Sequence, residues 1–280
     1  MTAPATLDLG IVTAGTAATE SQATAAAPTL QVDDLSVVFH GAAGQVIAID
    51  RMTLTVQPGE FVAIVGPSGC GKSTLLRVAS GLTPAHSGSI RVNGAVVDGP
   101  PPGVGFMFQR DTLLPWATVR QNIAVGCELS GLAPSKHAAR IDELIDLVHL
   151  QGFHHHYPAA LSGGMRQRVS LARLLAYEPD VYLMDEPFGA LDYQTKIVMG
   201  RELLRIWEAH RKSIVFVTHD IEEAVALADR VVVMSPRPGR IVAEHVIDLP
   251  RPRDPRTLRG DVRFGAYCRD IWAALAIDER

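Results

Sequence analysis

Hydrophobic and polar residues alternate through residues 29–60 and again through residues 89–97, which is the period of half-buried β-strands. The second stretch contains Asn93 followed by Gly94, a dipeptide that tolerates the positive φ angles of a type I′ hairpin turn. Both stretches therefore predict antiparallel β-sheet, and a glycine-rich turn and a helix separate them.

Short runs of uninterrupted hydrophobic residues predict a second kind of sheet. A strand that is apolar at every position is typical of a parallel sheet whose two faces are both covered. Such runs occupy residues 61–65, 181–184, 214–217 and 231–234, and helices are expected between them. This alternation of strands and helices indicates an α/β fold.

A helical segment interrupts that alternation from about residue 118 to residue 160. Its clearest signal is the spacing of Ile141, Leu144, Ile145 and Val148 at i, i+3, i+4 and i+7, which places them on one helix face. We expect a helical subdomain inserted at about residues 110–178.

Composition limits the possible locations and partners. The chain has 280 residues, 47% of them hydrophobic and 20% charged, and its apolar runs are far shorter than the roughly 20 residues that cross a membrane. A formal net charge of −4 gives no overall attraction to nucleic acid, so we expect no nucleic-acid partner. Three widely spaced cysteines indicate a reducing compartment rather than a disulfide framework.

The expected organisation is a main domain at residues 29–250 between two loose ends. Residues 1–28 are rich in Ala and Thr and lack the early basic residues of a secretory signal, so we interpret them as a disordered tail, with a processed targeting segment as the alternative. Residues 251–280 form a C-terminal extension, which begins with a proline-rich segment that cannot be regular helix.

The strongest chemical signal follows the strand at 61–65. Residues 66–73 read Gly-Pro-Ser-Gly-Cys-Gly-Lys-Ser, the pattern of a phosphate-binding loop between a strand and a helix. Glycines let consecutive backbone N–H groups turn toward phosphate oxygens, and the helix N-terminus faces the same anion. The expected nucleotide contacts are Gly66, Pro67, Ser68, Gly69, Cys70, Gly71, Lys72, Ser73 and Thr74, with Lys72 on the β and γ phosphates and Ser73 on Mg²⁺.

Two carboxylates end the strand at 181–184, at the sheet edge where parallel folds bind ligands. Asp185 is expected to hold Mg²⁺, and Glu186 to accept a proton from the attacking water. By itself such a pair is more often a solvated strand end, but the phosphate-binding loop upstream favours the catalytic interpretation.

A second anion-binding helix start is predicted at Leu161-Ser-Gly-Gly164. Ser162 is placed as the N-cap, and Gly163 and Gly164 allow close approach of the backbone. One nucleotide does not need two phosphate-binding helix ends within one chain, so this excess suggests a shared site.

The order of these motifs resembles the nucleotide-binding subunits of ATP-binding-cassette (ABC) transporters, over about residues 29–250. The resemblance implies a P-loop ATPase core with a mixed sheet, ATP and Mg²⁺ as cofactors, and a homodimer in which two cassettes pack head to tail. Ser162, Gly163 and Gly164 would then act on the ATP of the other cassette.

The same resemblance assigns four further residues. Phe39 would stack on adenine, although a core aromatic is the alternative. Gln109 would contact Mg²⁺ or the attacking water, and His219 would hydrogen-bond the γ-phosphate and orient that water. Asp192 would help to set the geometry across the dimer. The expected catalytic set is Glu186, His219, Gln109 and Lys72, and the expected metal ligands are Ser73, Gln109 and Asp185.

Three softer segments, residues 108–116, 185–192 and 234–241, resemble importers of nitrate, sulfonates and taurine. That branch implies two membrane-spanning permease subunits, an indirect solute-binding protein, and a place on the cytoplasmic face of the cell membrane, the inner membrane in a Gram-negative cell. Trp116 is our candidate for the permease-docking surface, and packing inside the helical insert is its alternative.

Two other functions stay open at this point. Cassette ATPases also serve DNA repair and translation, but they carry long coiled coils or two fused cassettes, whereas this chain shows one cassette and no sustained heptads. A P-loop kinase is compatible with the phosphate-binding loop, but it leaves Leu161-Ser-Gly-Gly164 unexplained.

Overall fold

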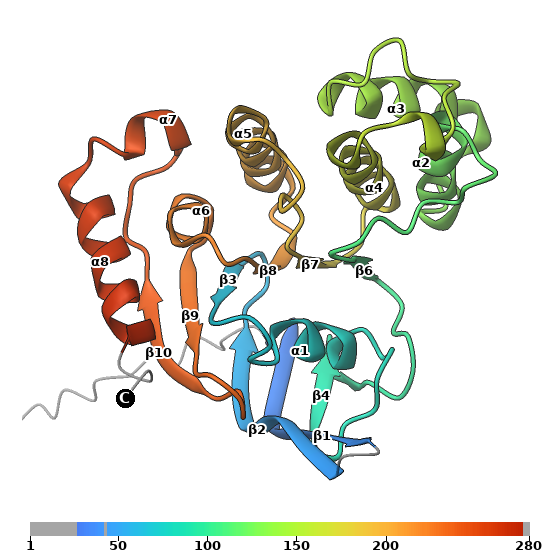
Figure 1. The fold of residues 1–280 in the computed structure, drawn as a ribbon. Coiled ribbons are helices and arrows are strands. Elements are labelled where there is room, and N and C mark those ends of the chain that lie inside the picture. Colours follow the sequence, from blue (N-terminus) through green and yellow to red (C-terminus); the bar gives the residue numbers. More distant parts are fainter. Residues whose placement is uncertain (1–26, 42–43, 277–280) are drawn as a thin grey trace, which may run out of the picture.

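The computed structural model describes residues 27–41 and 44–276, and its centre is a six-stranded sheet (Figure 1). Five strands run parallel and the edge strand β10 pairs antiparallel with β9, so the expected mixed sheet is confirmed. The strand order is β10 (Ile241–Val246), β9 (Arg230–Met234), β3 (Phe61–Val65), β8 (Ser213–Val217), β7 (Val181–Asp185) and β6 (Val104–Met107).

A second, antiparallel sheet lies below the first in Figure 1. Its order is β2 (Gly44–Val56), β1 (Leu30–Gly41), β4 (Ser87–Val92) and β5 (Ala95–Val96). Between β4 and β5, Asn93 and Gly94 have φ angles of 48° and 81°, as the predicted hairpin turn requires. Helix α1 (Lys72–Ala79) packs against β2, β4 and β7 and so joins the two sheets.

Strand β3 is apolar throughout because its two faces enter two different cores. Phe61, Ala63 and Val65 pack with the helices on one side of the large sheet. Val62 and Ile64 pack with α1 and the antiparallel sheet on the other. The side chains are 0–1% exposed, so the strand is fixed on both faces and the loop that follows it begins from a rigid base.

The helical subdomain stands beside the large sheet, at the upper right of Figure 1. It contains α2 (Val119–Leu129), α3 (Pro134–Leu147), the 3₁₀ turn η1 (Pro158–Ala160) and α4 (Gly163–Tyr177). Thr118 and Gln121 form a capping box at the start of α2. The predicted apolar face of α3 is confirmed, because Ile141, Leu144 and Ile145 are at most 4% exposed.

Helices α5 (Tyr193–His210) and α6 (Ile221–Leu227) lie above the large sheet, and α7 (Pro255–Leu258) and α8 (Val262–Ala276) follow β10 (Figure 1). The expectation of a loose C-terminal end is wrong for residues 255–276. Phe264 and Ile271 of α8 enter the main core, where α8 packs against α6, β9 and β10. The predicted N-terminal tail, residues 1–28, lies almost wholly outside the described residues.

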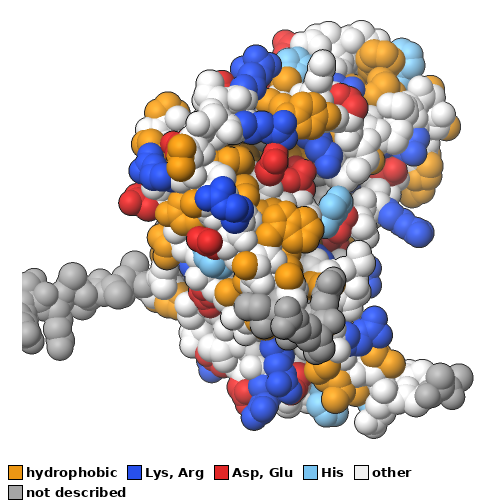
Figure 2. Space-filling model, turned by 60° about the vertical axis from the view of Figure 1, so that its left-hand side comes forward, with side chains coloured by type: hydrophobic (Ala, Val, Ile, Leu, Met, Phe, Trp, Pro, Cys, Tyr) orange, Lys and Arg blue, Asp and Glu red, His pale blue; other side chains and the backbone are white. Residues whose placement is uncertain are grey.

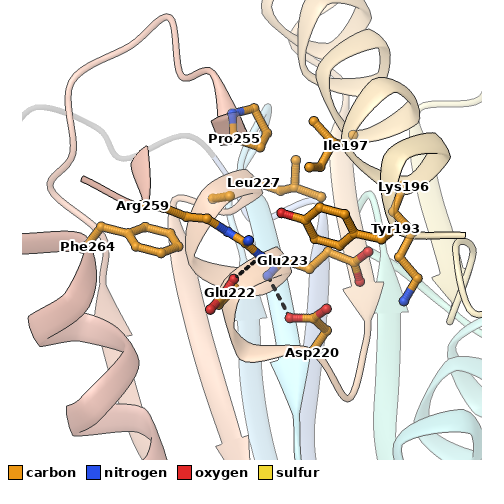
Figure 3. Close-up of a pocket in the computed structure, with 12 residues that line it drawn as sticks. Tyr193, Lys196, Ile197, Asp220, Glu222, Glu223, Leu227, Pro255, Arg259 and Phe264 are labelled. Atoms are coloured by element: carbon orange, nitrogen blue, oxygen red, sulfur yellow. Dashed lines mark hydrogen bonds and ion pairs between the residues drawn. The ribbon is translucent and has the colours of Figure 1, made fainter. Parts of the chain in front are cut away.

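The C-terminal segment also lines a small pocket together with α5 and α6 (Figure 3). Arg259 pairs with Glu222 of α6, and its guanidinium lies 4.8 Å from the ring centroid of Tyr193 at the start of α5. On the surrounding face, Figure 2 shows basic, acidic and hydrophobic side chains interspersed. Within the described part of the chain, no helix is both long and apolar enough to span a bilayer.

Candidate functional site

The loop between β3 and α1 has the backbone that its glycines predict. Gly69 and Gly71 have φ angles of 75° and 113°, a region that other residues rarely adopt. At position 66 glycine is needed for lack of room rather than for its φ angle, because a Cβ there would lie 2.9 Å from the carbonyl oxygen of Met234. The loop thus wraps tightly around the start of α1, at Lys72.

The Lys72 ammonium is held inside this loop. Its Nζ donates to the carbonyl oxygens of Gly66 at 2.6 Å and Pro67 at 2.9 Å, and the residue is 6% exposed. The Cys70 thiol is buried behind the loop, with Sγ 3.8 Å from Nζ of Lys72. The loop therefore places one positive charge under the position that an anion would occupy, while Cys70 points into the protein.

Asp185 and Ser73 meet across the end of the sheet. The Ser73 hydroxyl donates to Oδ1 of Asp185 at 2.9 Å. Burial raises the pKa of Asp185, and the hydrogen bond from Ser73 partly offsets that effect. A buried carboxylate beside a hydroxyl is an oxygen donor set of the kind that Mg²⁺ prefers, so the residues present fit the expected ion.

Two of the expected catalytic residues, Gln109 and His219, contact one carboxylate oxygen of a third, Glu186. Its Oε2 accepts a hydrogen bond from Nε2 of Gln109 at 3.1 Å and lies 3.3 Å from Nδ1 of His219. Glu186 itself has a φ of 47°, and its backbone N–H donates to the carbonyl of Val217 at 2.9 Å. Three loops, which follow β6, β7 and β8, thus meet at this carboxylate.

Gln167 is a site residue that the motifs did not reveal. Its Nε2 donates to the Glu186 carbonyl at 3.2 Å, and its Oε1 accepts from the Ala190 N–H at 3.2 Å. The side chain is 4% exposed and ties α4 to the segment that carries Glu186. A signal existed in the sequence, because Gln167 is a polar residue on the helix face shared with Leu171 and Leu174.

The pocket over the phosphate-binding loop is lined by residues of strands β1 and β2, of α1, and of loops that follow strands of the large sheet. Phe39 of β1 lines it and is 45% exposed, so the alternative of a core aromatic is wrong. Arg237, from the loop after β9, lines the same pocket and is the second residue that the sequence did not single out. The full lining is Phe39, Val46, Ala48, Ser68, Gly69, Gly71, Lys72, Ser73, Thr74, Gln109, Glu186 and Arg237.

Ser162, Gly163 and Gly164 do not line that pocket. Ser162 is the N-cap of α4, as predicted, and its Oγ accepts from the Met165 N–H at 3.3 Å. Ser162 and Gly163 are exposed, so this helix start faces outward. Asp192 is likewise exposed as the N-cap of α5, where hydrogen bonds from Thr195 lower its pKa.

Trp116 lies outside the pocket, in the loop that leads from Gln109 to α2. Its side chain is 74% exposed, whereas the neighbouring Leu113 is buried. The alternative that Trp116 packs inside the helical insert is therefore wrong. A large exposed aromatic in the loop that follows Gln109 is a candidate contact for another protein.

Comparisons with known proteins agree with this geometry. A family model described as ABC transporter matches residues 49–189. The nitrate import ATP-binding protein NrtD of Synechocystis is 49% identical over 221 residues, covering 79% of this chain and 83% of NrtD. The taurine import ATP-binding protein TauB of Rhizobium johnstonii is 43% identical over 251 residues, or 88% of this chain and 96% of TauB.

A solved structure is also similar. It is the dimeric, post-hydrolysis state of the ATP-binding cassette MJ0796 bound to ADP and phosphate. The TM-score is 0.72 at 27% sequence identity, and the match covers 79% of this chain and all of the solved chain.

Proposed function

The chain belongs to the ABC transporter family, and from that premise we propose that it is the ATP-binding subunit of an importer for a small anion or zwitterion such as nitrate, a sulfonate or taurine. The observation that carries the proposal is the meeting of Gln109, Glu186 and His219 beside a complete phosphate-binding loop. The likeness to the nitrate and taurine import proteins supports the substrate class.

ATP is proposed to bind with its phosphates over residues 66–74. Loop N–H groups and the N-terminus of α1 favour an anion at this position, and Lys72 can exchange its two carbonyl partners for phosphate oxygens. Phe39 offers an exposed aromatic side chain in the lining of the same pocket, on which adenine can stack.

Mg²⁺ would be held by Ser73, Asp185 and Gln109. When bound, the ion supplies neutralisation of charge on the phosphate oxygens. The chain provides the oxygen ligands and keeps Asp185 in place through the hydroxyl of Ser73.

Glu186 is proposed to accept the proton of the attacking water. Its carboxylate is fixed from two sides by Gln109 and His219, and its backbone is fixed by Val217 and Gln167. This positioning leaves the carboxylate able to orient a water molecule in line with the γ-phosphate. His219, whose side chain is 59% exposed, can then contact the γ-phosphate.

A second copy of the chain is proposed to complete the site. Ser162, Gly163 and Gly164 form an exposed helix N-terminus, and they are not part of the pocket in their own chain. In a head-to-tail pair they would face the phosphates bound by the partner, with Asp192 beside the interface. The dimeric state of the similar MJ0796 cassette supports this arrangement.

Two permease subunits are the proposed membrane partners, with the cassette on the cytoplasmic face of the membrane and a solute-binding protein acting indirectly. Trp116 is the proposed docking residue, because it is exposed and only a short loop separates it from Gln109. Nucleotide binding at Gln109 can therefore be communicated to the permease.

The proposal is tested in two steps. Purified protein should hydrolyse MgATP with water alone, whereas a P-loop kinase would need an acceptor molecule. Proteoliposomes that contain the protein and its two membrane subunits, supplied with the solute-binding protein, should then take up nitrate, taurine or an alkanesulfonate only with ATP. Hydrolysis without any such uptake would favour a cassette ATPase that serves another process.

A further inference from the structure

The loop between β9 and β10, residues 235–240, is fixed against the nucleotide pocket rather than projecting into solvent. Its backbone joins β2 through two hydrogen bonds, from the Gly239 N–H to the Ala48 carbonyl at 2.9 Å and from the Asp50 N–H to the Gly239 carbonyl at 3.1 Å. Arg240 pairs with the carboxylate of Asp50. The loop is thus anchored on the strand that forms one wall of the pocket.

The same loop touches the phosphate-binding loop directly. A Cβ added to Gly239 would lie 2.1 Å from the carbonyl oxygen of Cys70 and 2.8 Å from Cε of Met234. This contact leaves no room for a side chain, so glycine is required at this position by space. The position of Arg237, two residues earlier, is therefore set relative to the phosphate-binding loop.

Arg237 extends from this anchored loop over Gly69. Its Nε donates to the Gly69 carbonyl at 3.3 Å, and its Nη2 lies 3.2 Å from the position that a Cβ would occupy on Gly69. The residue is exposed and lines the pocket that also contains Phe39 and Lys72. One hydrogen bond to Gly69 leaves most of the guanidinium donors available for a ligand.

The positive charge of the Arg237 guanidinium has no ion-pair partner among the described residues. Among the described residues, none of the carboxylates lies within ion-pair distance of its guanidinium, whereas Arg230, Arg240 and Arg251 each have such a partner. The charged groups that line the pocket are Lys72, Arg237 and Glu186. Two cations, Lys72 and Arg237, therefore line this pocket against one carboxylate.

We propose that Arg237 is a nucleotide-binding residue that contacts the phosphate chain of ATP from the side of Gly69. This inference rests on the proposed function, because it assumes that ATP occupies the pocket over residues 66–74. A guanidinium is well suited to this contact, since its planar set of N–H donors can bind phosphate oxygens at two points while Nε keeps its bond to Gly69.

The test compares Arg237→Gln and Arg237→Lys with Arg256→Gln, which removes one exposed arginine charge outside the pocket. Dissociation constants for MgATP and for inorganic tripolyphosphate are measured by calorimetry at fixed ionic strength. For the Gln variant we expect about tenfold weaker binding of both ligands, the size of one charge-assisted hydrogen bond. The Lys variant should lie between it and the wild type, and Arg256→Gln should match the wild type.

Phe39→Ala separates the phosphate contact from stacking on the base. It should weaken MgATP but leave tripolyphosphate unchanged, whereas Arg237→Gln should weaken both. Equal MgATP binding by Arg237→Gln and the wild type would overturn the inference, and so would a loss of MgATP binding with tripolyphosphate binding unchanged. If the wild type itself failed to bind MgATP, the proposed function would fail instead.

Discussion

Nδ1 of His219 lies 3.3 Å from Oε2 of Glu186, although His219 follows strand β8 and Glu186 follows strand β7. Gln109, from a third loop, donates to the same oxygen. Parallel strands β6, β7 and β8 are neighbours, so their carboxyl ends bring these loops to one edge of the sheet. In the proposed function, this carboxylate acts on the water that attacks a phosphate bound over Lys72.

Replacing Glu186 by Gln should remove the proton acceptor while preserving size and most hydrogen bonds. We expect MgATP binding to persist, a dimer to accumulate, and hydrolysis to fall by about 10²–10⁴-fold, the usual contribution of a general base. Turnover and light scattering measure the two effects. Glu128→Gln, at an exposed position on α2, is the matched control, and an unchanged turnover of Glu186→Gln would show that another group is the base.

Gln167 does not line the nucleotide pocket, but replacing it by Glu should still impair ATP hydrolysis. The change keeps the shape of the side chain but removes the N–H group that donates to the Glu186 carbonyl. A carboxylate facing a carbonyl in a buried position should lower the free energy of unfolding by about 1–3 kcal/mol. Urea unfolding and kcat measure the two losses, and a normal kcat in a destabilised variant would limit Gln167 to a structural role.

Glu223 should make stability depend on pH. Burial raises the pKa of Glu223 to about 7 from its ordinary 4.5, and the Thr218 hydroxyl donates a hydrogen bond to its carboxylate. Figure 3 shows Glu223 in the lining of the pocket between α5, α6 and α7. The folded state therefore binds this proton more tightly than the unfolded state, and the corresponding stability is lost as the pH rises through 7.

The variant Glu223→Gln isolates that effect. Between about pH 5.5 and pH 8.5 the wild type should lose about 2 kcal/mol relative to the variant, which cannot titrate at this position. Urea unfolding of both proteins at the two pH values gives the difference. A constant difference between the two proteins across that range would contradict the raised pKa.

Trp116→Ala should uncouple transport from hydrolysis. The side chain is 74% exposed, so its loss should neither open a cavity nor alter the phosphate-binding loop. We expect uptake by the assembled transporter to fall strongly while ATP hydrolysis by the isolated subunit stays near the wild-type rate. Trp272→Ala on α8, an exposed tryptophan at another position, is the control, and normal uptake by Trp116→Ala would remove Trp116 from the docking surface.

Local patterns predicted much of the fold and the site. The Asn93–Gly94 turn and the N-cap at Ser162 depend on residues only a few positions apart, so the sequence identifies them directly. Strand β3 was visible because all five of its residues are apolar. Parallel strands also end at a common edge, which is why Asp185 and Glu186 were expected at a ligand-binding position, whereas His219 was expected there only from the family resemblance.

Contacts between residues far apart in the sequence could not be predicted from local patterns. The proline-rich segment near residue 250 hid the fact that Phe264 and Ile271 return to the main core. Arg237 was part of a recognised segment, but its contact with Gly69 spans 168 positions in the sequence and depends on the pairing of β9 with β3. Gln167 is similar, since its partners lie on a loop that only the tertiary fold brings to α4.

The central claim is that each ATP is bound between two copies of the chain, and a mixture of two inactive variants tests it most directly. Lys72→Ala disables the phosphate-binding loop. Gly163→Asp places a negative charge at the exposed start of α4, where the nearest atom to an added Cβ is 3.9 Å away, so the fold should tolerate it. Each variant alone has no intact composite site.

A heterodimer of the two has one intact site if the loop of one chain faces the helix start of the other. ATP hydrolysis by an equal mixture should then recover to about a quarter of the wild-type rate, because half of the dimers formed at random carry one of two sites. A mixture that is no more active than either variant alone would show that the loop and the helix start do not act on one ATP across two chains.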